Sequence, residues 1–207
     1  RFSYNQAIAA EAVGEMVATV EYVDDVIPEH IGFSFSGYAL PDAFHEPRIH
    51  IYPVSTFSAS SERAADTVTS LRSLLDSGRL PAPGGGFEGK TIPILPPFNA
   101  GQLLHTQIAF VDFQGERGVR FLTQYAQYYA PINNTDLFYT FQGLTDDGEY
   151  YVAAILPVAH PSLPADSSEI PGGDPDAFAP TYETYANDVA LQLAGYAASE
   201  FTPDLAL

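Results

Sequence analysis

Polar side chains interrupt two apolar stretches in the second half of this sequence, and their types suit ligand binding. Arg120, Gln124 and Tyr125 fall in the first stretch, and Tyr139 and Gln142 fall in the second. Because side chains alternate between the faces of a strand, Arg120 and Gln124 would share one face, opposite Tyr125. A guanidinium there needs hydrogen-bonding partners, and we expect Gln124 and Gln142 to be its neighbours. These five residues are our predicted ligand-binding site, in which the tyrosines stack against a sugar or another flat group.

The same residues also have a purely structural interpretation. Polar side chains in a sheet often form a hydrogen-bond network inside the protein, and tyrosines often pack in its core. Under this interpretation, which describes the more common use of such residues, the five side chains stabilise the fold and touch no ligand.

Familiar catalytic signatures are missing from the sequence. It has no Gly-x-Ser-x-Gly elbow, no His-Glu-x-x-His helix and no Gly-x-Gly-x-x-Gly directly after an expected strand. Gly84-Gly85-Gly86 comes nearest to a phosphate loop, and we interpret it as a flexible loop because we expect neither a helix nor a Lys-Ser/Thr pair after it. The histidines follow no metal-binding spacing; they are His30, His45, His50, His105 and His160. The catalytic residues are therefore unknown from the sequence, and we lean towards a protein that is not an enzyme.

Acidic loops are the only candidate metal ligands. They contain Asp24-Asp25, Asp146-Asp147 and the segment from Asp166 to Asp176. Calcium prefers carboxylates and loop carbonyls, but none of these loops has the Asp-x-Asp-x-Asp-Gly pattern. We predict solvated turns and no cofactor, with Ca²⁺ as the alternative.

The charge balance limits the partners. The 207 residues include 26 acidic side chains but only 8 Lys and Arg, and the net charge is -18. Nucleic acids and anionic membrane surfaces require clustered cations, which this sequence does not have. The absence of cysteine excludes disulfides, thiolate nucleophiles and iron–sulfur clusters. The remaining partners are a small-molecule ligand or another protein.

The termini and the apolar runs bear on location. The longest apolar run, 150–158, has the length of a strand and is too short to cross a membrane. The chain begins at Arg1 without a methionine, which suggests a processed N-terminus. We expect an extracytoplasmic protein, either secreted or anchored to the outer face of a membrane.

Hydrophobic periodicity predicts one α+β domain spanning 1–207. It has a mainly antiparallel sheet of about six or seven strands, covered by helices near 61–77 and 181–200. The expected strands lie within the first forty residues, at 49–54, and in a meander over 103–158. Breaker-rich loops are expected at 79–102 and 161–180.

Capping residues define the two helices. Ser61 is a predicted N-cap and Gly78 a predicted stop for the first helix. Thr181 is the predicted N-cap of the second helix, which we expect to continue until Pro203 and to place a tyrosine-lined face against the sheet. In the meander, Asp147-Gly148 predicts a tight antiparallel hairpin.

Several segments carry a family resemblance. They are Gly118-Val-Arg-Phe-Leu-Thr-Gln-Tyr-Ala-Gln127, Pro131-Ile-Asn-Asn134, 137–145, 147–152, Tyr52-Pro53-Val54 and 201–205. On these segments the chain resembles an uncharacterised family of secreted or lipid-anchored bacterial proteins. The order of elements is also similar to that of the PsbP-like α/β/α sandwich, in which a strand follows the last helix. The resemblance implies an extracytoplasmic location and a fold, but no activity.

These observations favour an extracytoplasmic binding or accessory domain without catalytic activity. One alternative is a hydrolase that cleaves glycans or peptides with a pair of carboxylates. The other is a structural subunit of a larger complex, which would present a large apolar patch to its partner.

Overall fold

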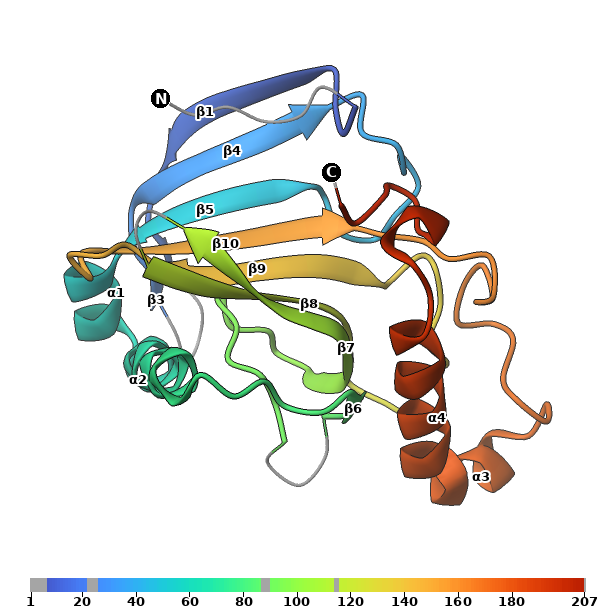
Figure 1. Ribbon diagram of the computed structural model, residues 1–207. Coiled ribbons are helices and arrows are strands. Elements are labelled where there is room, and N and C mark those ends of the chain that lie inside the picture. The colour runs from blue at the N-terminus through green and yellow to red at the C-terminus, as the bar shows by residue number, and fades with distance from the viewer. Residues whose placement is uncertain (1–6, 22–25, 87–89, 114–115, 207) are drawn as a thin grey trace.

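The structure is a computed structural model, and it describes residues 7–21, 26–86, 90–113 and 116–206. Its centre is an eight-stranded antiparallel sheet with the strand order β1-β4-β5-β10-β9-β8-β7-β6 (Figure 1). The strands are β1 (Glu11–Val17), β4 (His30–Ser36), β5 (Arg48–Pro53), β6 (Gly84–Gly85), β7 (Gly101–Phe113), β8 (Glu116–Ala126), β9 (Phe138–Leu144) and β10 (Tyr150–Pro157). A separate two-stranded ribbon joins β2 (Val20–Glu21) to β3 (Val26–Ile27). The predicted α+β class with a mainly antiparallel sheet is confirmed.

The meander is the most predictable part of the sheet. Strands β7, β8, β9 and β10 pair antiparallel in sequence order. At the β9–β10 turn, Gly148 has a φ of 68° and its N–H donates to the carbonyl of Thr145. A left-handed φ suits glycine, which confirms the predicted hairpin. The sequence also predicts a turn at 115–118 of the meander; residue 115 lies outside the described residues, and 116–118 belong to β8.

The predicted number of strands was too low because β6 lies inside a segment expected to be a loop. The two residues of β6 pair with Leu104 and His105 of β7. The neighbouring Gly86 approaches the sheet so closely that a Cβ atom there would lie 2.2 Å from the carbonyl oxygen of Gln102. Only glycine fits this contact. The glycine run, which suggests a flexible loop in the sequence, therefore forms a strand at the edge of the sheet.

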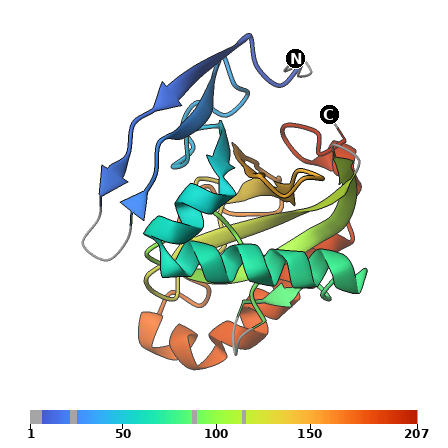
Figure 2. The ribbon, with the colours of Figure 1, turned by 90° about the vertical axis from the view of Figure 1, so that its left-hand side faces the viewer.

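Helices α1 (Val54–Ser60) and α2 (Glu62–Ser77) cover one face of the sheet, as Figure 2 shows. The Ser61 hydroxyl accepts a hydrogen bond from the N–H of Ala64 at 3.0 Å, and Gly78 ends α2 with a φ of 60°. Both capping predictions are therefore confirmed. Val68 and Leu71 of α2 pack against buried side chains of β8 and β10 in one core cluster. We call this side of the sheet the helix face.

The C-terminal helix is shorter than predicted. Helix α4 (Tyr182–Ala194) packs against β6 and β7 through Ala186, Ala190 and other buried side chains. It ends at Gly195 because Gln107, at a bulge in β7, donates its side-chain amide to the carbonyls of Leu193 and Tyr196 at 2.7 and 2.9 Å. These bonds satisfy terminal carbonyls that another turn of helix would otherwise use.

The start of α4 also differs from the prediction. The Thr181 hydroxyl does not cap α4; it donates to the carbonyl of Phe178 at 2.9 Å. The segment expected to be a loop before α4 contains the short helix α3 (Pro175–Phe178) and a 3-10 turn (Ala179–Thr181). The chain therefore enters α4 from an existing helical turn, and no separate cap is needed. A second 3-10 turn (Ala198–Glu200) follows α4.

Candidate functional site

The structure places the five predicted ligand-binding residues in separate surroundings. Gln142 lies on the helix face, where its side-chain amide binds both the N–H of Leu95 at 2.9 Å and the carbonyl of Leu95 at 3.3 Å. The Gln142 amide nitrogen also donates to the Thr140 hydroxyl, and the Gln142 amide oxygen accepts a hydrogen bond from the Tyr151 hydroxyl at 2.6 Å. Gln142 is fully buried. All these partners belong to the protein, so Gln142 fixes the loop before β7.

Gln124 has the same role on another loop. Its amide nitrogen donates to the carbonyl of Pro131, and its oxygen accepts from the N–H of Asn133, both at 3.0 Å. The expectation that Gln124 and Gln142 are neighbours of Arg120 is wrong. Gln142 points to the other face of the sheet, and Gln124 turns towards the segment that follows β8.

Tyr125 packs inside the helix-face core. Its ring stacks on Phe98 at 4.5 Å between centroids, and its hydroxyl accepts a hydrogen bond from Gln102 at 2.9 Å. Burial raises the pKa of Tyr125 well above its ordinary value. Gln102 in turn binds the N–H of Ile92 at 3.0 Å and the carbonyl of Ile92 at 3.3 Å. Tyr125 therefore belongs to a structural network.

Arg120 and Tyr139 are the two predicted residues that the structure brings together. They lie on the face opposite the helix face, where Arg120 donates to the carbonyl of Leu205 at 3.1 Å. Burial raises the pKa of Tyr139, and the charge and hydrogen bond of Arg120 counteract that increase. Of the five predicted ligand-binding residues, Arg120 and Tyr139 are therefore the two that still lie together.

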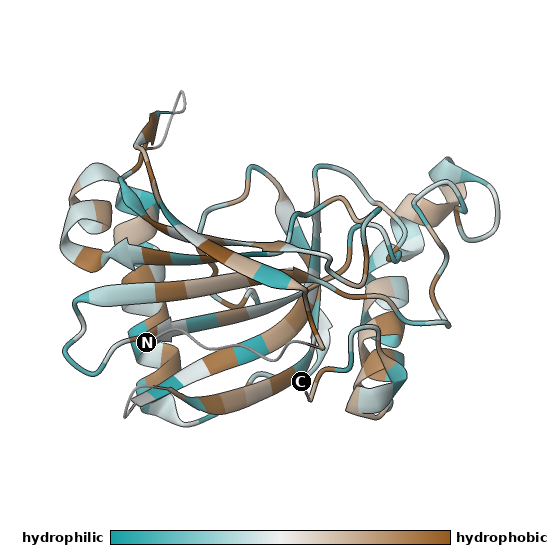
Figure 3. Ribbon diagram, turned by 90° about the horizontal axis from the view of Figure 1, so that it is seen from above, coloured by the Kyte–Doolittle hydropathy of each residue, from teal (hydrophilic) through white to brown (hydrophobic). Residues whose placement is uncertain are grey.

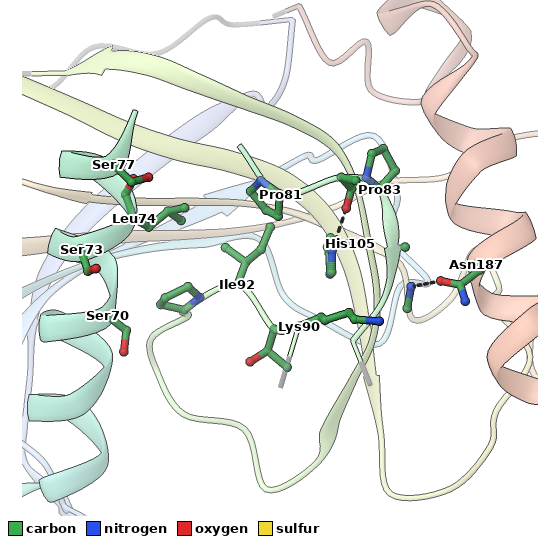
Figure 4. Close-up of a pocket in the computed structure, with 15 residues that line it drawn as sticks. Ser70, Ser73, Leu74, Ser77, Pro81, Pro83, Lys90, Ile92, His105 and Asn187 are labelled. Atoms are coloured by element: carbon green, nitrogen blue, oxygen red, sulfur yellow. Dashed lines mark hydrogen bonds between the residues drawn. The ribbon is translucent and has the colours of Figure 1, made fainter. Parts of the chain in front are cut away.

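The largest cleft described lies elsewhere, between α2 and α4 (Figure 4). It has a volume of about 680 Å³, which is within the range of ligand pockets. Figure 4 shows serines of α2 on one side, Asn187 of α4 on the other, and Lys90, Ile92 and His105 between them. The lining residues are Ser70, Ser73, Leu74, Ser77, Pro81, Ala82, Pro83, Gly84, Gly85, Lys90, Thr91, Ile92, Pro93, His105 and Asn187.

Hydrogen bonds from three elements hold the walls of this cleft in place. The Asn187 side-chain oxygen accepts from the N–H of Gly85 at 2.8 Å and so ties α4 to β6. His105 of β7 is bonded to the carbonyl of Ala82 at 3.0 Å, and Gln102 holds Ile92 as described above. The cleft is therefore preformed, which reduces the ordering cost of binding.

His105 carries an unsatisfied acceptor beside the cleft. A carbonyl can only accept, so Nε2 must carry the proton in its bond to Ala82. Burial lowers the pKa of His105, so the ring is neutral at pH 7 and Nδ1 keeps its lone pair. This Nδ1 is buried and has no hydrogen-bond partner in the described part of the chain. A ligand hydroxyl or a water that reached it would remove the cost of an unpaired acceptor.

The cleft also differs in charge from the rest of the chain. Among the lining residues that the structure describes are one ammonium group, Lys90, and no Asp or Glu, although the chain has 26 acidic residues. Ser70, Ser73 and Thr91 add exposed hydroxyls, and the prolines add flat apolar walls. This combination suits a small ligand that bears hydroxyls and one negative charge.

Sequence reasoning missed the lysine of this cleft, although a signal was present. Gly84, Gly89, Lys90 and Thr91 have the spacing Gly-x-x-x-x-Gly-Lys-Thr of a phosphate loop, so our expectation that the Lys-Ser/Thr pair is absent was wrong. A phosphate loop needs a helix directly after the lysine, whose N-terminus receives the phosphates. Here residues 91–100 contain bends and no helix. The spacing therefore identified Lys90 but not a nucleotide-binding fold.

A histidine pair lies on β4 and β5, with His30 buried and His50 half-buried. His30 Nε2 is 2.9 Å from His50 Nδ1, and His30 Nδ1 is 2.8 Å from the carbonyl of Pro28. The Tyr52 ring packs on His30 at 4.5 Å. Burial and the neighbouring charges of His30 and Arg48 lower the pKa of His50 to about 4. The sequence shows scattered histidines because β4–β5 pairing, not sequence spacing, brings these two together.

The acidic loops mainly bind their own backbone. The Asp147 carboxylate accepts from the Thr145 hydroxyl and from the N–H of Glu149, which lower its pKa. Asp166 accepts from the N–H of Ser168. No group of three metal-ligating side chains occurs among the residues that the structure describes, and Asp24-Asp25 lies outside them. The calcium alternative stays a prediction.

Comparisons with known proteins add no identification. No family model matches the chain, and no curated protein or solved structure is significantly similar to it. Within the described ranges, no helix is both long and apolar enough to cross a membrane.

Proposed function

We propose that this protein is an extracytoplasmic binding domain without catalytic activity, and that its cleft between α2 and α4 binds a small hydroxylated carboxylate such as a sugar acid. One observation carries the proposal: a preformed cleft in a chain with a net charge of -18 is lined by a lysine and by no described carboxylate. A single ammonium matches a single carboxylate. A phosphate dianion would leave one negative charge without a partner.

The other lining groups support a polyhydroxylated ligand over a plain fatty or aromatic acid. Ser70 and Ser73 project from the exposed side of α2, and each hydroxyl both donates and accepts. Pro81, Pro83 and Pro93 present apolar surface on which the C–H face of a sugar ring can pack. Among the described residues no hydrogen bond joins His105 to a lining serine, which supports a binding role over a nucleophile of the serine–histidine kind.

A Lys90→Gln variant is expected to bind D-galacturonate about 10- to 100-fold more weakly than the wild type, because one charge-assisted hydrogen bond is lost. Isothermal titration calorimetry of the full chain measures this difference. Arg79→Gln is the matched control, since it removes one positive charge from an exposed residue near the cleft that does not line it. We expect the control to bind as the wild type does.

The same titration includes two further probes. D-galactose, which lacks the carboxylate, is expected to bind more weakly than galacturonate, with no difference between the wild type and Lys90→Gln. Equal weakening by Lys90→Gln and Arg79→Gln would contradict the proposal, as would tighter binding of inorganic phosphate than of galacturonate. Release of reducing sugar from a galacturonate oligomer would instead support the hydrolase alternative.

A further inference from the structure

The face of the sheet opposite α1 and α2 carries a continuous apolar row. Cross-strand partners lead from Phe33 on β4 to Ile49 on β5, Ala154 on β10 and Phe141 on β9, and the next partner is Arg120 on β8. Partners in register share a face, so these five side chains lie on one side of the sheet. Figure 3 looks onto the sheet from above and shows apolar residues on several adjacent strands.

Part of this row is open to solvent. Phe33, Ile49 and Phe141 are half-buried, and the neighbouring Ile31 and Met16 are 37% and 60% exposed. Gly118 and Gly143 leave room for the Phe141 ring, which would clash with a Cβ atom at either position. The large ring therefore lies flat across two strands beside Arg120 and extends the apolar surface up to the guanidinium.

Arg120 is a half-buried cation at the end of this row. Three arginines lie in the described strands, and alternation places Arg48 and Arg117 on the other face. The described contacts of Arg120 are the carbonyl of Leu205 and the Tyr139 side chain, and no described carboxylate forms an ion pair with it. A guanidinium has five donors, so several remain for an anion, and a half-buried charge without a counter-ion favours binding one.

A groove next to Arg120 deepens the apolar face. It has a volume of about 160 Å³ and is lined by Tyr38, Tyr139, Leu156 and Leu205, among others. Asp204 also lines it, and its carboxylate accepts from the N–H of Ala206 at 2.8 Å. Arg120 contacts two of the groove residues, Tyr139 and Leu205, so the cationic end of the row and the groove form one continuous site.

We propose that this face binds a free fatty acid, with the carboxylate on Arg120 and Tyr139 and the alkyl chain along the apolar row. Neighbouring strands lie about 4.8 Å apart, so the row from Arg120 to Phe33 crosses four strand spacings and measures about 19 Å. This is close to the extended length of a dodecanoyl or myristoyl chain. Charge selects the ligand: an acid places its anion beside Arg120, the one arginine that the described strands present on this face, whereas an alcohol of equal length gains only the apolar contact.

Dodecanoate below its micelle-forming concentration is the probe, and its binding to the full chain is measured by isothermal titration calorimetry. We expect Arg120→Gln to weaken dodecanoate binding about 10- to 100-fold and Arg120→Lys to keep most of it, because lysine retains the charge. Arg72→Gln, on the exposed side of α2, removes the same charge far from this face and is expected to bind normally. Dodecanol is expected to bind weakly to all four proteins.

The design separates this proposal from the others. Galacturonate binding should be unchanged in Arg120→Gln, so failure at one site leaves the other testable. Equal binding of dodecanoate by the wild type and Arg120→Gln would overturn the fatty-acid site, and so would equal affinity for dodecanol and dodecanoate. A third outcome would also overturn the fatty-acid site. In it, the wild type does not bind dodecanoate and forms a dimer in sedimentation velocity, and the Ile49→Glu variant is a monomer. That result would identify a second copy of the chain as the occupant of this face.

Discussion

Replacing Gln142 with leucine is expected to lower the free energy of unfolding by about 2–4 kcal/mol, because several buried polar groups lose their partners together. The variant leaves the N–H and carbonyl of Leu95 and the hydroxyl of Tyr151 without the amide that binds them. Leu95 and Tyr151 are fully buried, so water does not replace the lost bonds at no cost.

Urea unfolding followed by circular dichroism measures the effect, and Gln127→Leu is the matched control. Gln127 makes a side-chain bond of 2.7 Å to the carbonyl of Asn99, but it is exposed, so water can take over that bond. We expect a cost below about 1 kcal/mol for the control. A loss in Gln142→Leu no larger than in Gln127→Leu would show that Gln142 does not stabilise the loop.

Three glutamines share this role, and it explains why the sequence could identify two of them, Gln124 and Gln142, but not their function. Gln102, Gln124 and Gln142 each use one side-chain amide to bind the backbone of a loop. A side-chain amide has the same donor and acceptor as a peptide group, so it can act as a strand partner for a segment that forms no strand. A polar residue in an apolar strand shows that a partner exists; only the folded chain shows that the partner is a loop.

Local signals predicted the elements whose stability is local. The Asp147-Gly148 turn and the Ser61 and Gly78 caps act within a few residues, and all three were predicted from the sequence. The end of α4 depends on Gln107, and β6 depends on its pairing with β7. These contacts join segments far apart in the chain, and neither periodicity nor capping rules report them.

The candidate cleft was beyond sequence reasoning for the same reason. Its lining comes from α2, the loop before β7, β7 itself and α4, and no local pattern relates these four segments. The phosphate-loop spacing around Lys90 shows the opposite problem: a local pattern can indicate a function that the fold does not support. A motif with the correct residues predicts phosphate binding only where a helix follows, and Pro93, Pro96 and Pro97 prevent one here.

Acidification is expected to destabilise the protein through His50, by about 3 kcal/mol between pH 6.5 and pH 4. The pKa of His50 is lowered from 6.5 to about 4 in the folded state, and each unit corresponds to about 1.4 kcal/mol. Above pH 6.5 the ring is neutral in both states and has no effect. As the pH falls below 6.5 the unfolded chain binds a proton that the folded chain does not, so stability decreases until the folded ring is also protonated near pH 4.

The carboxylates of this acidic chain titrate over the same range, so the test compares two proteins at each pH. In His50→Asn the amide nitrogen can take the place of Nδ1 and donate to His30, but it cannot titrate. Urea unfolding at intervals from pH 7.5 to pH 4 should show wild-type stability falling relative to the variant by about 3 kcal/mol, with most of the change below pH 6.5. Parallel pH profiles for the two proteins would mean that His50 is protonated as readily in the folded chain as in the unfolded one. The His30–His50 pair would then not control stability in acid.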